Sequence, residues 1–157
     1  MRDQPDVDLV LVPVGGGSGA AGATIVRDSV RPNARVVAVQ SEAAKSAFLS
    51  WKERREVESP MGTFAEGLAT RRPFSLPQSI LRKRLDDFVL VSDDEIRAAQ
   101  LILLAETRTL VEAAGAATLA AALRYPETLA PKTAIIVSGA NVTLAQLQDL
   151  VAHSPAV

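Results

Sequence analysis

A run of glycines between an apolar segment and a helix-like segment constrains this chain most. Residues 12–22 read Val-Pro-Val-Gly-Gly-Gly-Ser-Gly-Ala-Ala-Gly, so five of the eight residues from Gly15 to Gly22 are glycine. Glycine lets backbone amides converge on one point, and the first N–H groups of a helix have no partner within it. Phosphate binds well there, with the Ser18 hydroxyl as a further donor. The run predicts a phosphate-binding loop rather than an ordinary tight turn, for which one glycine often suffices.

The kind of phosphate ligand is left open by the loop itself. Residues 17–22 also fit the dinucleotide fingerprint GxGxxG, which expects an acidic residue at the end of the next strand, about 20 residues on. Gln40 occupies that position and Glu42 follows two residues later. A Walker loop is excluded because no Lys-Ser or Lys-Thr follows the glycines, and the hydrolase pattern GxSxG fails at Ala20. Dinucleotide binding therefore stays as the alternative.

Four short apolar runs predict the strands of the fold. They are rich in β-branched residues, which is typical of buried parallel strands, and span residues 7–14, 35–40, 88–91 and 133–137. The stretches between them have helical spacing, with a capping box at residues 92–95 and a weaker one at 143–146. Residues 59–62 and 72–73 indicate turns. The order β, α, β, α, α, β, α, α, β, α predicts an α/β fold: a three-layer, mostly parallel sheet of about four strands flanked by helices, in one domain over residues 1–157.

Composition excludes several classes of protein. Hydrophobic residues make up 48% of the 157, and 17 basic residues offset 18 acidic ones, so we expect a globular chain without a nucleic-acid partner. The absence of cysteine rules out disulfides and thiolate metal sites and agrees with a reducing compartment. No run is long enough for a membrane span, and residues 1–6 carry charges and a proline where a signal peptide needs an apolar core. We expect a cytoplasmic protein.

Three further segments carry a family resemblance. Residues 65–67 read Ala-Glu-Gly, residues 111–116 Val-Glu-Ala-Ala-Gly-Ala, and residues 137–142 Val-Ser-Gly-Ala-Asn-Val. Together with the glycine loop, and in the same order, they resemble motifs of the pyridoxal-phosphate-dependent serine/threonine dehydratases (threonine ammonia-lyases), which have fold type II. Alanine stands where that family usually has proline after the glutamate. The resemblance runs from about residue 6 to 151 and implies the carboxyl-terminal part of the large catalytic domain.

The resemblance also implies a cofactor and roles for particular residues. The phosphate of pyridoxal phosphate would be held by the loop amides of Gly15, Gly16, Gly17, Ser18 and Gly19. Ser138, after the last strand, would hydrogen-bond the pyridine nitrogen. The Gly67 backbone and Glu112 would lie near the ring. Taken alone, Ser138 fits a turn or cap, and Glu112 a solvated carboxylate. The implied reaction is β-elimination and deamination of L-threonine or L-serine to a 2-oxo acid and ammonia, in amino-acid metabolism.

The catalytic lysine of the family has no counterpart in this sequence. It lies upstream of the glycine loop, in a Ser-Phe-Lys-x-Arg-Gly type of motif, whereas Lys45, Lys52, Lys83 and Lys132 all fit solvated positions. We therefore expect a domain that is incomplete relative to the family and a chain that is inactive alone. A fragment, one subunit of a split enzyme and a truncated gene product remain open. A homo-oligomer or a complementary chain is the expected partner, because a truncated sheet exposes apolar edges.

A metal site is not expected. Some relatives bind a divalent cation through a Glu-Pro segment after the second strand, but residues 40–46 read Gln-Ser-Glu-Ala-Ala-Lys-Ser. His153, the single histidine, is predicted to be neither a ligand nor a base. The alternative to a dehydratase part is a non-catalytic module that binds a phosphate or a dinucleotide through the same loop, or that only associates with a partner.

Overall fold

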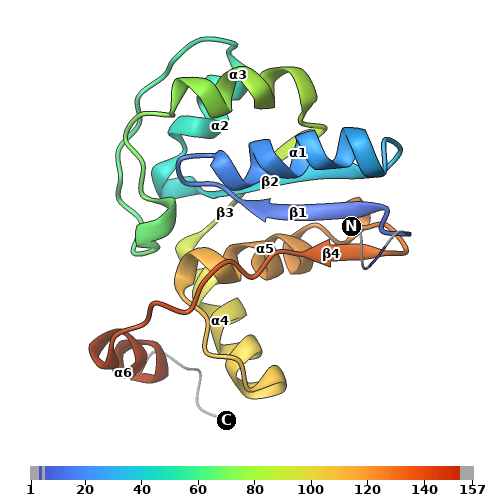
Figure 1. Cartoon of the computed structure of the whole chain (residues 1–157). Coiled ribbons are helices and arrows are strands. Elements are labelled where there is room, and N and C mark those ends of the chain that lie inside the picture. The colour runs from blue at the N-terminus through green and yellow to red at the C-terminus, as the bar shows by residue number, and fades with distance from the viewer. Residues whose placement is uncertain (1–3, 5, 153–157) are drawn as a thin grey trace.

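The chain folds into one parallel β-sheet with helices on both faces (Figure 1). The computed structural model describes residue 4 and residues 6–152. The strands are β1 (Leu9–Pro13), β2 (Arg35–Ser41), β3 (Asp87–Val91) and β4 (Thr133–Ile135), in the order β3-β2-β1-β4 and all parallel. The predicted α/β class and sheet of about four strands are confirmed.

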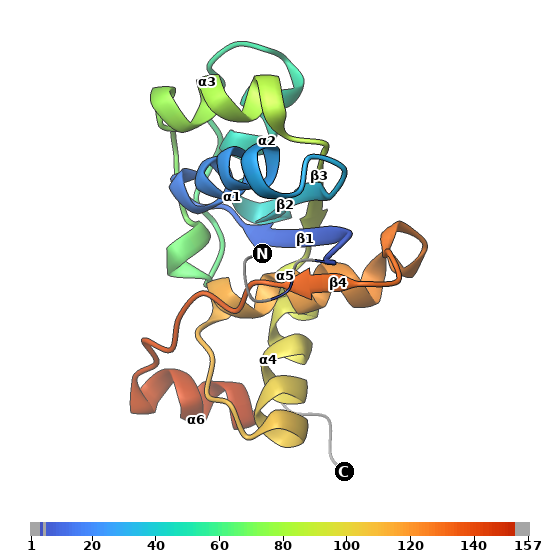
Figure 2. The ribbon, with the colours of Figure 1, turned by 45° about the vertical axis from the view of Figure 1, so that its right-hand side comes forward.

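The helices form the two outer layers. One face of the sheet carries α1 (Ser18–Val30), α2 (Ser46–Lys52) and α3 (Ser75–Arg84). The other carries α5 (Ala113–Arg124), with α4 (Asp93–Thr107) packed against α5 and α6 (Leu144–Ala152) against α4 (Figures 1 and 2). Three short 3₁₀ helices, η1 (Glu42–Ala44), η2 (Glu66–Leu68) and η3 (Pro126–Thr128), lie in the connections. Apart from these, the element order is the predicted one.

Alternation along the strands divides the apolar residues between two cores. In β1, Leu9 and Leu11 face α4 and α5, while Val10 and Val12 face α1, α2 and α3. Such a doubly covered strand needs apolar residues at every position, as the sequence has. The small side chains of α5 are buried almost throughout, so that its backbone lies close to the sheet.

The last strand is shorter than the predicted 133–137. The amide of Ile136 still donates to the carbonyl of Leu11 (3.0 Å), but the next ladder bond would need an N–H from Pro13, which has none. The carbonyl of Ile136 accepts a hydrogen bond from the Thr118 hydroxyl instead (3.1 Å). Ser138 therefore follows the strand by three residues rather than standing directly at its end.

Both predicted capping boxes are present. The Ser92 hydroxyl accepts a hydrogen bond from the Glu95 amide (3.2 Å), and the Glu95 carboxylate accepts one from the Ser92 amide (2.7 Å). Thr143 and Gln146 make the same reciprocal pair at the start of α6. These caps fix where α4 and α6 begin, and hence where the preceding loops end.

The strand order reverses direction beside β1. The chain moves from β1 outward to β2 and β3 and then returns to the opposite side of β1 for β4. In open parallel sheets, ligands bind outside the carboxyl ends of the strands at such a reversal. The glycine loop follows β1 and the Ser138 segment follows β4, so both lie at this reversal.

A buried arginine joins α1 to the strand connections. Arg27 in α1 pairs with Asp86 (2.5 Å) and donates to the carbonyls of Ala34 (2.8 Å) and Arg84 (2.6 Å). Burial lowers the pKa of Arg27, but the hydrogen bonds to Asp86 and Asp28 raise that pKa by more. The side chain is thus a cation whose hydrogen bonds tie three segments together.

Candidate functional site

The glycine loop presents free backbone amides at the start of α1. Gly17 has φ +89°, a left-handed conformation that strains residues with a side chain. Among the residues that the structure describes, no group accepts a hydrogen bond from the amides of residues 15–19. Unpaired amides at the positive end of a 13-residue helix suit an anion.

A second segment packs directly on this loop. A methyl group added at Gly15 would overlap the carbonyl oxygen of Gly67 in η2, and one at Gly16 would lie 2.5 Å from the ring of Phe74. The Thr70 hydroxyl donates to the carbonyl of Gly15 (3.3 Å). The loop is therefore held between α1 and the 67–74 segment. Glycine is required at position 15 because a side chain there meets backbone, whereas at position 16 the exposed Phe74 ring would have to move.

Glu112 and the segment after β4 form the other side of the site. Glu112 precedes α5; its amide donates to the carbonyl of Gly139 (3.0 Å), and its carboxylate accepts from the Asn141 amide (3.2 Å). A methyl group at Gly139 would overlap that carboxylate, and one at Gly67 would lie 3.8 Å from it. The structure thus brings Gly15, Gly67 and Glu112 together at the carboxyl ends of the strands.

Ser138 lies beside the start of α5. A methyl group at Gly115 would lie 3.1 Å from the Ser138 nitrogen. The Ser138 side chain is exposed, and its hydroxyl has no hydrogen-bonding partner in the described part of the chain. It is available to a ligand at this edge. Ser18 and Gly19 are likewise exposed at the first turn of α1.

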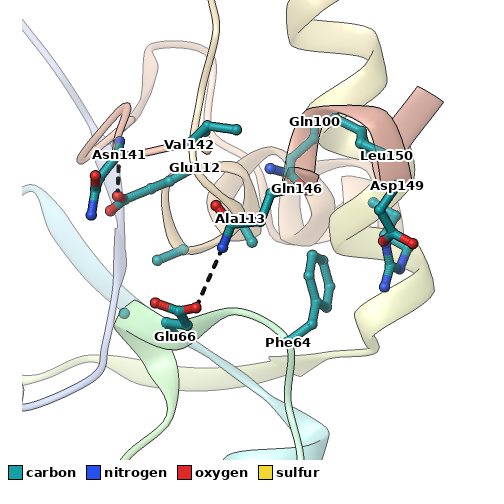
Figure 3. Close-up of a pocket in the computed structure, with 13 residues that line it drawn as sticks. Phe64, Glu66, Gln100, Glu112, Ala113, Asn141, Val142, Gln146, Asp149 and Leu150 are labelled. Carbon is teal, nitrogen blue, oxygen red and sulfur yellow. Dashed lines mark hydrogen bonds and ion pairs between the residues drawn. The ribbon is translucent and has the colours of Figure 1, made fainter. Parts of the chain in front are cut away.

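A pocket of about 340 Å³ opens beside Glu112 (Figure 3). Its walls come from η2, α4, the start of α5 and α6, and include Phe64, Glu66, Arg97, Glu112, Asn141 and Gln146. Arg97 lies over the Phe64 ring (4.1 Å to its centroid) and pairs with Asp149 (2.7 Å). The Gln146 side chain donates to the Glu66 carboxylate (3.3 Å). These contacts attach α6 to the segment that carries Gly67.

The two residues considered for a dinucleotide ribose are both engaged elsewhere. Gln40 is completely buried, and its side-chain oxygen accepts a hydrogen bond from the Phe48 amide (3.1 Å). Glu42 pairs with Arg124 (2.8 Å). The Gln40 side-chain nitrogen has no partner but is completely buried, so a ribose beside the loop could not reach it, and Glu42 is already paired. Both observations weaken the dinucleotide alternative.

The lysines stand apart from the pocket. Lys132 pairs with Asp6, Lys52 lies over the ring of Phe48 (5.6 Å to its centroid), and Lys45 and Lys83 are exposed. None of the four lines the pocket.

The described residues contain neither a metal-binding cluster nor a membrane-spanning helix. No group of three or more His, Asp or Glu residues is placed to hold a metal within residues 6–152. In the same part of the chain, no helix combines the length and apolar character needed to cross a membrane. His153, predicted to have no catalytic or ligand role, lies outside the described residues.

Several contacts at the site were not predicted from the sequence. Thr70 and Phe74 touch the glycine loop, and Arg97 and Gln146 border the pocket. No local pattern marks these four residues, because their roles depend on tertiary packing. Asn141 is different: it belongs to the Ser-Gly-Ala-Asn motif, which already pointed to this edge.

Comparison with known proteins supports the same family. The family model described as "Pyridoxal-phosphate dependent enzyme" matches residues 1–139. The L-threonine ammonia-lyase of Thermotoga maritima is 34% identical over 96% of this chain, and that of Geobacter sulfurreducens 38% over 96%. The catabolic L-threonine dehydratase of Escherichia coli K12 is 36% identical over 96%. This chain covers 38%, 38% and 47% of those three proteins.

Solved structures agree with the sequence matches. The processed form of threonine deaminase isoform 2 from Solanum lycopersicum superposes with a TM-score of 0.89 and 31% identity, over 96% of this chain and 45% of that one. Maize serine racemase superposes with a TM-score of 0.87 and 28% identity, over 98% of this chain and 50% of that one. The predicted fold type, cofactor class and dehydratase resemblance are confirmed at the level of the family. The chain belongs to the family of pyridoxal-phosphate-dependent enzymes, and within that family it is similar to the threonine dehydratases.

Proposed function

We propose that this chain forms the phosphate-binding and ring-facing part of a threonine or serine dehydratase. The observation that carries the proposal is the convergence of the free amides of residues 15–19, the Gly67 backbone, Glu112 and Ser138 on the carboxyl edge of one sheet. Similarity to threonine ammonia-lyases supplies the substrate class. Because the chain spans less than half of those relatives, the complete reaction requires additional polypeptide.

The loop amides and the α1 dipole neutralise the phosphate of the cofactor without a basic side chain. Gly17 takes a left-handed conformation directly before α1, and the exposed Ser18 would add a hydroxyl donor. The fit to a phosphate is steric as well as electrostatic, since Gly15 and Gly16 leave no side chain in the loop.

Ser138 and Glu112 act at the ring. The Ser138 hydroxyl would hydrogen-bond the pyridine nitrogen and, being neutral, would not force a proton onto it as a carboxylate would. The Asn141 amide holds the Glu112 carboxylate beside the Gly67 backbone. When bound, pyridoxal phosphate supplies the electron sink for loss of the substrate α-proton and β-hydroxyl. The lysine that takes the proton would come from the additional polypeptide.

Titrations with ligands separate this proposal from its alternative. Purified chain is titrated with pyridoxal phosphate and with NAD, using the wild type, Ser18→Asp and Ser138→Ala. Pyridoxal phosphate is expected to bind the wild type, to bind Ser138→Ala about tenfold more weakly through loss of one hydrogen bond, and to be repelled by Ser18→Asp. NAD binding that is tight and unaffected by Ser138→Ala would support the dinucleotide module instead.

A chimeric enzyme tests the reaction itself. The 152-residue region of the Thermotoga maritima enzyme that aligns with this chain is replaced by this chain, and release of ammonia from L-threonine and L-serine is measured. Activity that falls on Ser138→Ala supports the dehydratase assignment. A folded chimera that binds pyridoxal phosphate but releases no ammonia from either amino acid would contradict it.

The open side of β4 is where we propose that the additional polypeptide packs. Within the described sheet, β4 pairs only with β1, and Ile136 and Val137 beyond it are each 39% exposed. Helix α1 exposes Ile25, Val26 and Val30 in addition. Unpaired strand edges and clustered apolar side chains favour association. The occupant is a chain or segment that carries the lysine, or a second copy of this chain.

Light scattering on a concentration series measures this association. Val137→Lys places a charge on the edge and is expected to shift the protein toward monomer, whereas Leu144→Lys, on an 80% exposed residue of α6, serves as the matched control. A wild-type chain that stays monomeric at every concentration, and that gains no mass on mixing with the amino-terminal half of a threonine ammonia-lyase, would contradict the proposal.

A further inference from the structure

Asp93, the first residue of α4, joins three segments that are distant in sequence. Its Oδ1 accepts hydrogen bonds from the hydroxyls of Ser41 (2.8 Å) and Thr63 (2.7 Å), and its Oδ2 accepts one from the Phe64 amide (3.1 Å). Ser41 ends β2, while Thr63 and Phe64 belong to the connection between α2 and α3. One half-buried carboxylate thereby ties that connection to the sheet and to α4.

The network continues through Thr63 toward η2. The Thr63 hydroxyl, which donates to Asp93, accepts a hydrogen bond from the Ala65 amide (3.1 Å). Ala65 is completely buried, and its carbonyl accepts from the Leu68 amide (2.8 Å), closing the turn of η2. Residues 53–65 contain no helix or strand, so these bonds, together with the bond from the Gly62 amide to the Ala43 carbonyl (2.9 Å), fix the entry into η2.

The position of η2 matters for the site on both sides. On one side the Gly67 carbonyl lies against Gly15 of the glycine loop, and on the other the Gly67 backbone lies close to Ala114 and Glu112. A displacement of η2 would open or crowd the loop and the Glu112 side together, because interiors packed this closely transmit small shifts.

We infer that Asp93 is a positioning residue that sets η2 against the glycine loop and thereby sets the affinity for pyridoxal phosphate. The effect on cofactor affinity rests on the proposed function, whereas the positioning of η2 does not. Asp93 lines neither the loop nor the pocket, and it reaches the pocket only through the backbone of Phe64. It therefore acts through its bonds to Thr63 and Phe64 and the Thr63 bond to Ala65.

Helix-end electrostatics alone do not account for Asp93. Asp93, Asp94 and Glu95 are all acidic residues in the first turn of α4, where negative charge is favourable. Asp94 is exposed and accepts no hydrogen bond from the residues that the structure describes. Asp94→Asn therefore removes the same charge from the same helix turn without touching the network, and it is the matched control for Asp93→Asn.

The experiment compares amide hydrogen exchange and cofactor affinity in the two variants. The asparagine side chain in Asp93→Asn has one oxygen and one NH₂ group. Depending on its orientation, either the Phe64 amide or the hydroxyls of Ser41 and Thr63 lose their acceptor. Amide exchange at residues 64–68 is expected to be about tenfold faster in Asp93→Asn than in Asp94→Asn, because a hydrogen bond to a charged group is lost. The melting temperatures of the two variants are expected to be alike. The Kd for pyridoxal phosphate, measured by absorbance titration, is expected to rise about tenfold in Asp93→Asn only.

The outcomes separate this inference from the proposed function. Equal exchange at residues 64–68 in the two variants overturns the positioning role, whatever the cofactor does. Faster local exchange with an unchanged Kd overturns the link between η2 and cofactor affinity. A wild-type chain that binds no pyridoxal phosphate refutes the proposed function and the affinity half of the inference, while the exchange result still decides the positioning half.

Discussion

The α-carbon of Gly15 faces the carbonyl oxygen of Gly67 so closely that a methyl group on it would overlap that oxygen. This contact joins two motifs that are 52 residues apart and brings the glycine loop to η2. Packing thus requires glycine at position 15, whether or not a ligand also requires it.

Gly15→Ala should damage the fold at this point. Overpacking of a close contact costs about 1–3 kcal/mol, and here the backbone of η2 must move to relieve it. Urea denaturation should show that loss, and pyridoxal phosphate should bind more weakly. Gly22→Ala is the control: a methyl group there meets nothing within 4 Å, and in the interior of α1 alanine should add about 0.5–1 kcal/mol. Equal stability of the two variants would contradict the contact.

Replacing the buried arginine should destabilise the chain. Arg27→Met leaves the carbonyls of Ala34 and Arg84 without their donor and Asp86 without its cation. Since the Asp86 side chain is 33% exposed, solvent screens part of the loss, and we expect about 1–3 kcal/mol. Arg31→Met removes a half-exposed ion pair (3.4 Å) and one hydrogen bond, to the Val7 carbonyl (3.3 Å), and should cost about 1 kcal/mol or less by the same urea measurement.

Stability should fall with acid through Glu95. Burial raises the pKa of Glu95, but hydrogen bonds from the Ser92 amide and the Arg124 side chain lower that pKa by more, so its net shift is downward. A carboxyl whose folded pKa is lowered stabilises the fold above its unfolded pKa, and this stability is lost as pH falls through the folded pKa. The urea midpoint should therefore decline below about pH 4.5, the unfolded value.

Two variants assign that decline. Glu95→Gln removes the titrating group and should give a flatter midpoint-against-pH curve. Arg124→Met removes one cause of the shift and should flatten the curve partly. A Glu95→Gln curve with the wild-type slope would mean that another carboxyl is responsible.

The lysines should not hold the cofactor covalently. Since all four are exposed on the surface and none lines the pocket beside Glu112, borohydride treatment in the presence of pyridoxal phosphate should give only scattered, substoichiometric labelling in peptide mapping. A single stoichiometric adduct at Lys45, Lys52, Lys83 or Lys132 would show that the chain carries its own catalytic amine, contrary to the account above.

Strands, caps and layers could be predicted from the sequence because each has a local cause. The β-branched runs gave β1 to β4 within two residues at their ends, and Ser92 with Glu95 marked the start of α4. The end of β4 could not be predicted, since it depends on Pro13, a residue of the neighbouring strand that cannot donate. Strand register is a long-range property, and the apolar run at residues 133–137 does not contain it.

The site was partly predictable for the same reason. Gly15 to Gly19, Gly67, Glu112 and Ser138 lie in recognisable motifs, and the structure brings those segments to one edge of the sheet. Thr70, Phe74 and Asp93 lie in no motif that marks them as part of the site. Asp93 appeared in the sequence only as an acidic residue in a helix start, and its bonds to Ser41, Thr63 and Phe64 arise from tertiary folding.

The most direct test of the central claim compares pyridoxal phosphate with pyridoxal, which lacks the phosphate, by isothermal titration of the wild-type chain and Ser18→Asp. Several hydrogen bonds to a charged phosphate predict that the wild type binds pyridoxal phosphate about 100-fold or more tightly than pyridoxal. Ser18→Asp favours the start of α1 but repels phosphate, so it should remove most of that difference. Equal affinity of the wild type for the two compounds, or no binding of pyridoxal phosphate, would contradict the assignment of residues 15–19 as the phosphate site.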